Sequence, residues 1–189
     1  PACTGSMAFT GYARLAELIA ARDGAGIRLG DALAESLAAL SDLDRRAGAT
    51  SVAAYIEAHI EQGPVLEANG MDIGVVTGIQ GSRRFVCEFE GETAHAGTAP
   101  LALRRDAVQA AVRALAALNV AMEDPAGIVR YMVGRVQVEP NSPNSVARRA
   151  LFSIDLRHPD GAELARRAET ILPACTAAAP PCGGKVTQT

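Results

Sequence analysis

The chain has 189 residues, of which 49% are hydrophobic and 21% are charged, and this composition predicts a globular protein with a sizeable core. Its net charge of −3 gives no electrostatic reason to expect nucleic acid or an anionic membrane as a partner. No apolar run approaches the ~20 residues that span a bilayer and no signal peptide opens the chain, so we expect a cytoplasmic protein.

The N-terminal third predicts helices interrupted by one short strand. Apolar residues recur at helical spacing over 12–24 and 29–43. Residues 51–61, SVAAYIEAHIE, are compatible with a helix or a strand, but their aromatic and β-branched pair favours a strand that ends near His59. A Gly-Pro break then precedes one or two helical turns closed by Gly70.

The central part of the chain predicts two strands and a helix. The strands are expected over 72–79 and 83–92. The second places three apolar residues on one face, namely Phe85, Cys87 and Phe89. The helix is expected to begin after Pro100 and to end near Asn119. It should bury four residues at spacings of three and four: Val108, Val112, Leu115 and Leu118.

The remaining residues predict two strands, a second helix and a last strand. Residues 127–140 indicate a long strand with a bulge at Gly134, and residues 148–158 indicate another. The latter has one apolar face, formed by Phe152, Ile154 and Leu156. The helix opens at Asp160 with a capping-box pattern and is expected to end at Pro173.

This order of strand, helix, strand, strand, helix and strand predicts an α+β fold of the ferredoxin-like, split βαβ type. In that fold a four-stranded antiparallel sheet carries two helices on one face. The other face of the sheet would remain free to pair with something else.

His59 is the first candidate for chemistry, because neutral imidazole is a common metal ligand and a turn next to a strand end is both rigid and open. The simpler interpretation is a surface or core histidine, since no HExxH, HxH or carboxylate-rich partner lies nearby. The four cysteines lack CxxC spacing, so we expect free thiols rather than disulfides or a zinc knuckle.

Three residues in the second half of the chain could bind a ligand. His95 lies among small residues that let a ligand approach closely, although an ordinary loop histidine is the simpler interpretation. Asn144 lies in a turn-rich connection, where asparagine is most often turn chemistry. Arg157 lies opposite the apolar face of its strand and could clamp a carboxylate, although a surface salt bridge would also explain it.

Three stretches carry a family resemblance: YIEAHIEQGPVLEANGMDIGVVTGIQG, GETAHAGTAPLALRRDA and EPNSPNSVARRALFSIDLRH. In this order and spacing the chain resembles the N-carbamoyl-L-amino-acid hydrolases, β-ureidopropionases and allantoate amidohydrolases, which are relatives of the co-catalytic metallopeptidases. The resemblance runs from about residue 5 to about residue 171. The sequence departs from the family's motifs at three positions: Ala99 and Leu101 replace the threonine and methionine of HAGTTPM, and Ser145 replaces an apolar residue. None of these differences removes a functional group at a candidate position.

The resemblance implies two domains and two divalent metal ions, which would be zinc, manganese, cobalt or nickel. Residues 1–78 would be a partial α/β catalytic-domain segment that carries the metal ligand His59. Residues 79–189 would be a lid and dimerisation domain with a truncated last strand, through which the protein forms a homodimer. The family's other metal ligands have no counterparts in this sequence, so we expect part of a longer protein and an inactive isolated chain.

The resemblance also implies roles for the candidate residues. His95, Asn144 and Arg157 would all reach a substrate held in the neighbouring subunit's cleft. There His95 would polarise the amide carbonyl, while Asn144 and Arg157 would hold the substrate carboxylate. Gln62 is a weaker candidate for substrate contact. The expected reaction is hydrolysis of a carbamoyl or ureido C–N bond in a carbamoyl amino acid, β-ureidopropionate or allantoate. The alternatives are a non-catalytic dimerisation or binding module, or a peptidase or aminoacylase of the same clan.

Overall fold

The computed structural model describes residues 3–42 and 52–189. The chain forms two compact units, Pro1–Asn69 and Gly70–Thr189. The assignment of residues 1–78 and 79–189 to two functional domains stays a prediction. No helix in the described ranges is both long and apolar enough to cross a membrane.

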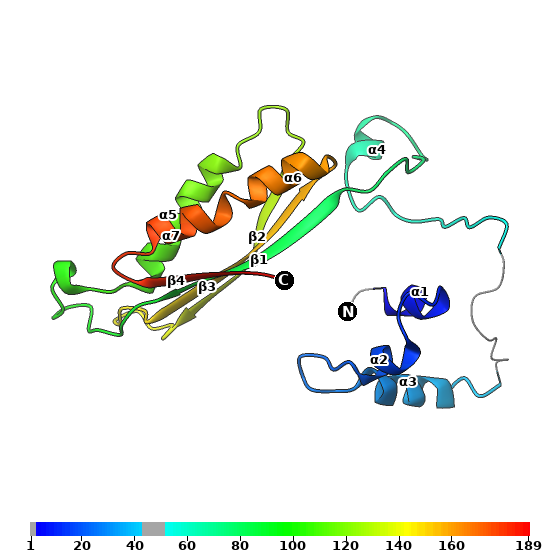
Figure 1. Cartoon of the computed structure of the whole chain (residues 1–189), viewed down its shortest axis with the longest axis horizontal. Helices are drawn as coiled ribbons and strands as arrows, with labels where there is room; N and C mark the ends of the chain where they lie inside the picture. Colours follow the sequence, from blue (N-terminus) through cyan, green and yellow to red (C-terminus); the bar gives the residue numbers. More distant parts are fainter. Residues whose placement is uncertain (1–2, 43–51) are drawn as a thin grey trace. The chain divides into compact units, whose positions relative to one another are not determined.

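The described residues of the first unit form four helices joined by irregular segments (Figure 1). Its helices are α1 (Thr4–Phe9), α2 (Leu15–Ala20), α3 (Leu29–Ala38) and α4 (Val65–Ala68). The two helices predicted near the N-terminus are therefore confirmed as α2 and α3, although both are shorter than expected. The predicted turn of helix before Gly70 is confirmed as α4, and Gly70 follows it with a φ of +64°.

Two predicted strands are wrong. Residues 52–61 and 72–79 have no regular secondary structure, while residue 51 lies outside the described residues. The apolar side chains of both segments are exposed, including Ile56 at 93% and Ile79 at 95%. A strand needs a neighbouring strand to satisfy its backbone groups, and no described strand pairs with either segment.

The second unit confirms the predicted split βαβ fold. Its elements are β1 (Gly81–Glu90), a 3₁₀ turn η1 (Leu101–Leu103), α5 (Ala107–Ala121), β2 (Arg130–Glu139), β3 (Arg149–His158), α6 (Gly161–Ala168), α7 (Ile171–Ala178) and β4 (Gly183–Gln188). The strands form one antiparallel sheet in the order β2-β3-β1-β4. Helices α5, α6 and α7 cover one face of this sheet (Figure 1). The predicted bulge at Gly134 is confirmed by a register shift between Val133 and Arg135.

The core lies between the two central strands and the helices. The predicted alternation is confirmed in both strands, because the apolar residues of β1 and β3 are buried: Phe85, Cys87, Phe89, Phe152, Ile154 and Leu156. Phe89 and Phe152 stack with their ring centroids 6.0 Å apart. Burial of each such side chain stabilises the fold by roughly 1.5–3 kcal/mol.

Helix α5 differs from its prediction in start and in buried face. Leu101–Leu103 form the 3₁₀ turn η1, and α5 begins only where Asp106 accepts hydrogen bonds from the first helical amides. Of the four residues predicted to be buried, Leu118 is buried, Val108 and Leu115 are partly buried against the core, and Val112 is 52% exposed. The other buried residues of the helix are Ala107, Ala110, Ala111 and Ala114. Because phenylalanine side chains from the sheet occupy most of the space in the core, the face of α5 that packs against them consists mainly of alanines.

The second predicted helix is divided in two. Asp160 caps α6 by accepting from the amide of Glu163, as expected, but Glu163 does not reach back to complete a capping box. Pro173 does not end the helix and lies within α7. It occupies the first turn of α7, where a helix amide has no intrahelical acceptor, so the missing N–H of proline leaves nothing unsatisfied.

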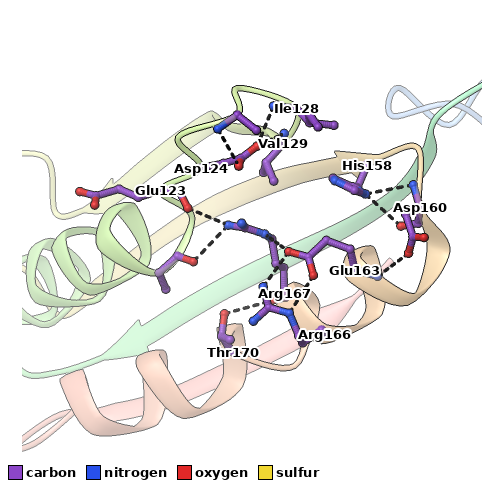
Figure 2. Close-up of polar contacts among 12 residues, drawn as sticks. Glu123, Asp124, Ile128, Val129, His158, Asp160, Glu163, Arg166, Arg167 and Thr170 are labelled. Atoms are coloured by element: carbon purple, nitrogen blue, oxygen red, sulfur yellow. Dashed lines mark hydrogen bonds and ion pairs between the residues drawn. The ribbon is translucent and has the colours of Figure 1, made fainter.

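The buried guanidinium of Arg167 ties α6 to the end of α5 (Figure 2). Its Nη1 lies 3.1 Å from the carbonyl oxygen of Glu123 and 3.4 Å from that of Ala121. Its Nε donates to Glu163 at 2.7 Å. The carbonyl end of a helix attracts a cation, so Arg167 joins the two helices through both charge and hydrogen bonds.

The ion pairs of Glu163 make stability depend on pH. Hydrogen bonds from Arg166, and then from Arg167, lower the pKa of Glu163 from 4.5 to about 2. A carboxylate with a lowered pKa contributes stability above its ordinary pKa, and this contribution is lost as pH falls through the folded value. We therefore expect Glu163→Gln to lower Tm at pH 7 by roughly 2–4 °C, a small effect because the pairs are screened by solvent.

Thermal unfolding between pH 7 and pH 2 checks this prediction. The difference between wild type and Glu163→Gln should shrink as pH falls from 4.5 towards 2. Glu169→Gln is the matched control, since Glu169 makes no ion pair with a described residue. A Tm difference independent of pH would contradict the proposed linkage.

Candidate functional site

His95 lies in the turn that follows β1, beside the connection between β2 and β3. The amide of Ala96 donates to the carbonyl of Asn144 at 3.0 Å, and the amide of Val146 donates to the carbonyl of Ala94 at 2.8 Å. These two bonds hold segments that are distant in sequence against each other. His95 and Asn144, both predicted site residues, are thereby brought together at one end of the sheet.

The imidazole of His95 is held in one tautomer by its own turn. The amide of Gly97 donates to Nδ1 of His95 at 3.1 Å. Since Nδ1 accepts this bond, the neutral ring carries its proton on Nε2, which is then a hydrogen-bond donor. His95 is exposed, so this donor is accessible to a ligand. A residue that polarises a substrate carbonyl needs a hydrogen-bond donor such as this Nε2–H. A general base acting through Nε2 would instead need the tautomer with its proton on Nδ1.

The side chain of Asn144 is oriented by two serines. Its Oδ1 accepts from Ser142 Oγ at 2.8 Å and from Ser145 Oγ at 3.4 Å. Its Nδ2 has no acceptor among the described residues, so this amide can donate to a ligand. Sequence reasoning missed both serines, although the NSPNS spacing was the available signal. Asn144 and His95 each keep one free donor, and a donor of this kind suits a carbonyl or carboxylate oxygen.

Arg157 lies on β3 and is already paired. Its Nε and Nη2 donate to the two carboxylate oxygens of Asp155 at 2.8 and 3.0 Å, and Arg84 adds a third contact at 3.2 Å. Hydrogen bonds from Arg157, and then from Arg84, hold the pKa of Asp155 below its usual range, although burial opposes them. Asp155 was missed as a functional partner, although its position two residues before Arg157 places both on one face.

Arg157 does not share a site with His95 in one copy of the fold. Residue 157 pairs with Ser82 near the start of β1, whereas the His95 turn follows the end of that strand. From Arg149 to Arg157 the strand advances eight residues, or about 26 Å at 3.3 Å per residue. A small substrate cannot span this distance, so one copy offers two separate groups of polar residues.

His59 lies in the first unit and can act as one metal ligand. Its Nδ1 is 2.6 Å from the carbonyl oxygen of Ile60. A carbonyl only accepts, so Nδ1 carries the proton and Nε2 keeps the lone pair that binds a metal, an arrangement common in metal-ligating histidines. Within the described ranges, however, no three His, Cys, Asp or Glu side chains form a group that could hold a metal ion.

Gln62 occupies a tight turn between His59 and α4. Its φ is +55°, a left-handed conformation that is uncommon for a residue other than glycine. The preceding Glu61 accepts from the amides of Val65 and Leu66 at 3.0 and 3.1 Å and so caps α4. The side chain of Gln62 is exposed. Its role in substrate contact stays a prediction.

Comparison with known proteins finds matches over most of the chain. Residues 77–181 match the family described as the peptidase dimerisation domain. Allantoate amidohydrolase from Bacillus subtilis is 38% identical over 137 residues, which cover 72% of this chain and 33% of the relative. N-carbamoyl-L-amino-acid amidohydrolase from Rhizobium meliloti is 39% identical over 165 residues, which cover 87% of this chain and 39% of the relative.

Solved structures give a similar result. The crystal structure of a hydantoinase/carbamoylase family amidase from Burkholderia ambifaria superposes with a TM-score of 0.83 at 37% identity. The match covers 100% of this chain and 46% of that one. This chain therefore spans less than half of the length of these relatives.

Gly97 sits so close to His95 that a methyl group should disturb the ring. A Cβ added at Gly97 would lie 3.3 Å from Cε1 and 3.5 Å from Nδ1 of His95. We expect Gly97→Ala to displace the imidazole by a few tenths of an ångström and to shift its ring ¹⁵N resonances. For the neutral ring of the wild type, these resonances should place the proton on Nε2.

Nitrogen NMR of the three histidines measures this directly. Gly161→Ala is the matched control, because no atom lies within 4 Å of the added Cβ. It should leave the His95 resonances unchanged. A wild-type ring protonated on Nδ1 would contradict the assigned tautomer.

Proposed function

Since this chain belongs to the peptidase dimerisation domain family, among the allantoate and N-carbamoyl-L-amino-acid amidohydrolases, we propose that it is part of a metal-dependent amidohydrolase. The substrate would be a small carbamoyl or ureido acid, such as an N-carbamoyl amino acid, β-ureidopropionate or allantoate. Attack of water on the carbamoyl carbon would break one C–N bond, and the resulting carbamate would decompose with loss of the second, so that the products are the free amine, ammonia and carbon dioxide.

The residues of this chain would bind and polarise the substrate. Nε2–H of His95 would donate to the carbamoyl oxygen, where negative charge develops in the transition state. Nδ2 of Asn144 and the free edge of the Arg157 guanidinium would hold the carboxylate. Because about 26 Å of β3 separates the two groups, His95 and Asn144 would come from one copy and Arg157 from its partner.

His59 would contribute one ligand to a pair of divalent metal ions. Bound divalent ions supply Lewis-acid chemistry and lower the pKa of water. The free Nε2 of His59 fits this role, and the remaining ligands would lie outside the described residues. In the complete protein, His59→Ala should reduce the bound metal by one equivalent per chain, measured by elemental analysis.

The proposal rests on one observation: backbone bonds pair the His95 turn with the Asn144 connection, and each of these two exposed side chains keeps one free donor. A non-catalytic dimerisation module is the second candidate, and the match of residues 77–181 to the peptidase dimerisation domain favours it.

Assays of the complete protein that contains this chain separate the two candidates. We expect metal-dependent release of ammonia from at least one carbamoyl or ureido acid, and none from the isolated 189-residue chain. N-acetyl amino acids and dipeptides test the aminoacylase and peptidase alternatives. Turnover by the isolated chain, well above a His59→Ala control, would contradict the proposal that the other metal ligands lie outside the described residues.

The proposed homodimer would form through the edge strand β2 and the neighbouring helix α5. As an edge strand, β2 presents unpaired backbone groups that a two-fold partner can satisfy. It also exposes Met132 at 57% and Val136 at 62%, and α5 exposes Val112 and Val120. An apolar edge of this kind is stabilised by a second copy.

Val136→Asp tests the proposed edge. A carboxylate would have to lose water in an apolar interface, so we expect the variant to sediment as a monomer while the wild type sediments as a dimer. Thr187→Asp places the same charge on the opposite edge strand β4 and should remain dimeric. Dissociation by Thr187→Asp alone would place the interface on the other edge.

Arg157→Lys tests the carboxylate clamp in the complete protein. An ammonium cannot reproduce the two-point contact of a guanidinium, so we expect kcat/KM to fall about thirtyfold or more, equivalent to about 2 kcal/mol. The loss should be much smaller for a substrate analogue whose carboxylate is replaced by a neutral amide. Arg130→Lys, opposite Arg157 on β2, is the matched control. Equal losses for both substrates would show that Arg157 is structural.

A further inference from the structure

We infer that Arg104 is a positioning residue, whose guanidinium holds the His95 turn in the shape that presents Nε2–H to a ligand. Arg104 touches no group proposed to contact substrate. Its effect on catalysis rests on the proposed function, whereas its effect on the turn does not.

The guanidinium of Arg104 donates hydrogen bonds to two carbonyl oxygens of the His95 turn. Its Nε donates to the carbonyl of Ala99 at 3.0 Å, and its Nη2 donates to the carbonyl of Ala96. These carbonyls flank Gly97 and Thr98, so one rigid side chain bridges both ends of the turn. The planar fork of arginine is suited to two acceptors at a fixed separation, and a lysine ammonium is not.

The bonds within the turn depend on this bridge. The amides of Thr98 and Ala99 donate to the carbonyl of His95 at 3.3 and 3.1 Å, and Gly97 donates to Nδ1. Most of the turn is exposed, so water competes for each of these bonds. Without Arg104 the two carbonyls would turn to water, and the amide of Gly97 would no longer be fixed on the imidazole.

The main chain of Arg104 is itself anchored. It follows the 3₁₀ turn η1 and precedes Asp106, which caps α5. The side chain is half-buried and lines a cavity of about 460 Å³ together with Asp106, Gln109 and Arg113. Arg104 therefore couples the His95 turn to a helix packed against the core. Truncation of its side chain would leave a space that a free guanidinium ion can enter.

Nitrogen NMR and amide exchange of the 189-residue chain test the positioning role without any assay of activity. In Arg104→Ala we expect the Ala99 and Gly97 amides to exchange at least about tenfold faster, and the His95 ring to average between tautomers. Arg105→Ala is the matched control, because its side chain donates one hydrogen bond among the described residues, to the carbonyl of Pro181 and not to the His95 turn. Unchanged exchange and ring resonances in Arg104→Ala would overturn the inference.

Kinetics of the complete protein test the consequence for catalysis. A displaced donor should lower kcat about 10- to 100-fold and change KM by less than about threefold. Guanidinium chloride at millimolar concentration should restore part of kcat in Arg104→Ala, while sodium chloride of equal ionic strength should not. Arg104→Lys should recover less than the guanidinium ion does. A fall in folded protein that fully accounts for lost activity, with no rescue, would make Arg104 merely structural.

If the wild-type complete protein hydrolyses no carbamoyl or ureido acid, the proposed function fails. The exchange and resonance measurements would still decide whether Arg104 holds the turn.

Discussion

The antiparallel pairing of β1 with β3 is the constraint on which the rest of the second unit depends. It runs in register from Gly81 opposite His158 to Glu90 opposite Arg149. This register aligns the buried rows of the two strands and lets Phe89 stack on Phe152. It also fixes both ends of the sheet, because the His95 turn leaves β1 where β3 begins. A slip of one residue would reverse every side chain and separate these features.

Periodicity alone was sufficient to predict the four strands of the sheet and the positions of the helices that cover it, but not the start and the buried face of α5. The alternation around Cys87 and the bulge at Gly134 follow from local sequence. The buried face of α5 does not, because the choice between its valine and alanine rows depends on how much room the sheet leaves. Similarly, residues 72–79 have the composition of a strand, yet a strand forms only where another strand lies beside it.

The candidate site was predictable as residue types but not as an arrangement. A histidine in a small-residue turn and an asparagine in a serine-rich connection were visible in the sequence. The pairing of their two segments depends on two backbone bonds between residues distant in sequence, and no local pattern reports these. The pairing of Arg157 with Asp155 depends on side-chain geometry in the same way. The roles of Arg104 and the two serines arise from side chains that point back at the main chain, which composition does not reveal.

The length of β3 has a consequence for genetics. If a homodimer draws on opposite ends of two sheets, each cleft combines Arg157 of one chain with His95 of the other. Two inactive alleles, one altered at each position, would then assemble into a mixed dimer with one intact cleft and one doubly defective cleft. Co-expression would restore activity that neither allele shows alone. If both residues served a cleft from the same chain, the two alleles could not complement each other.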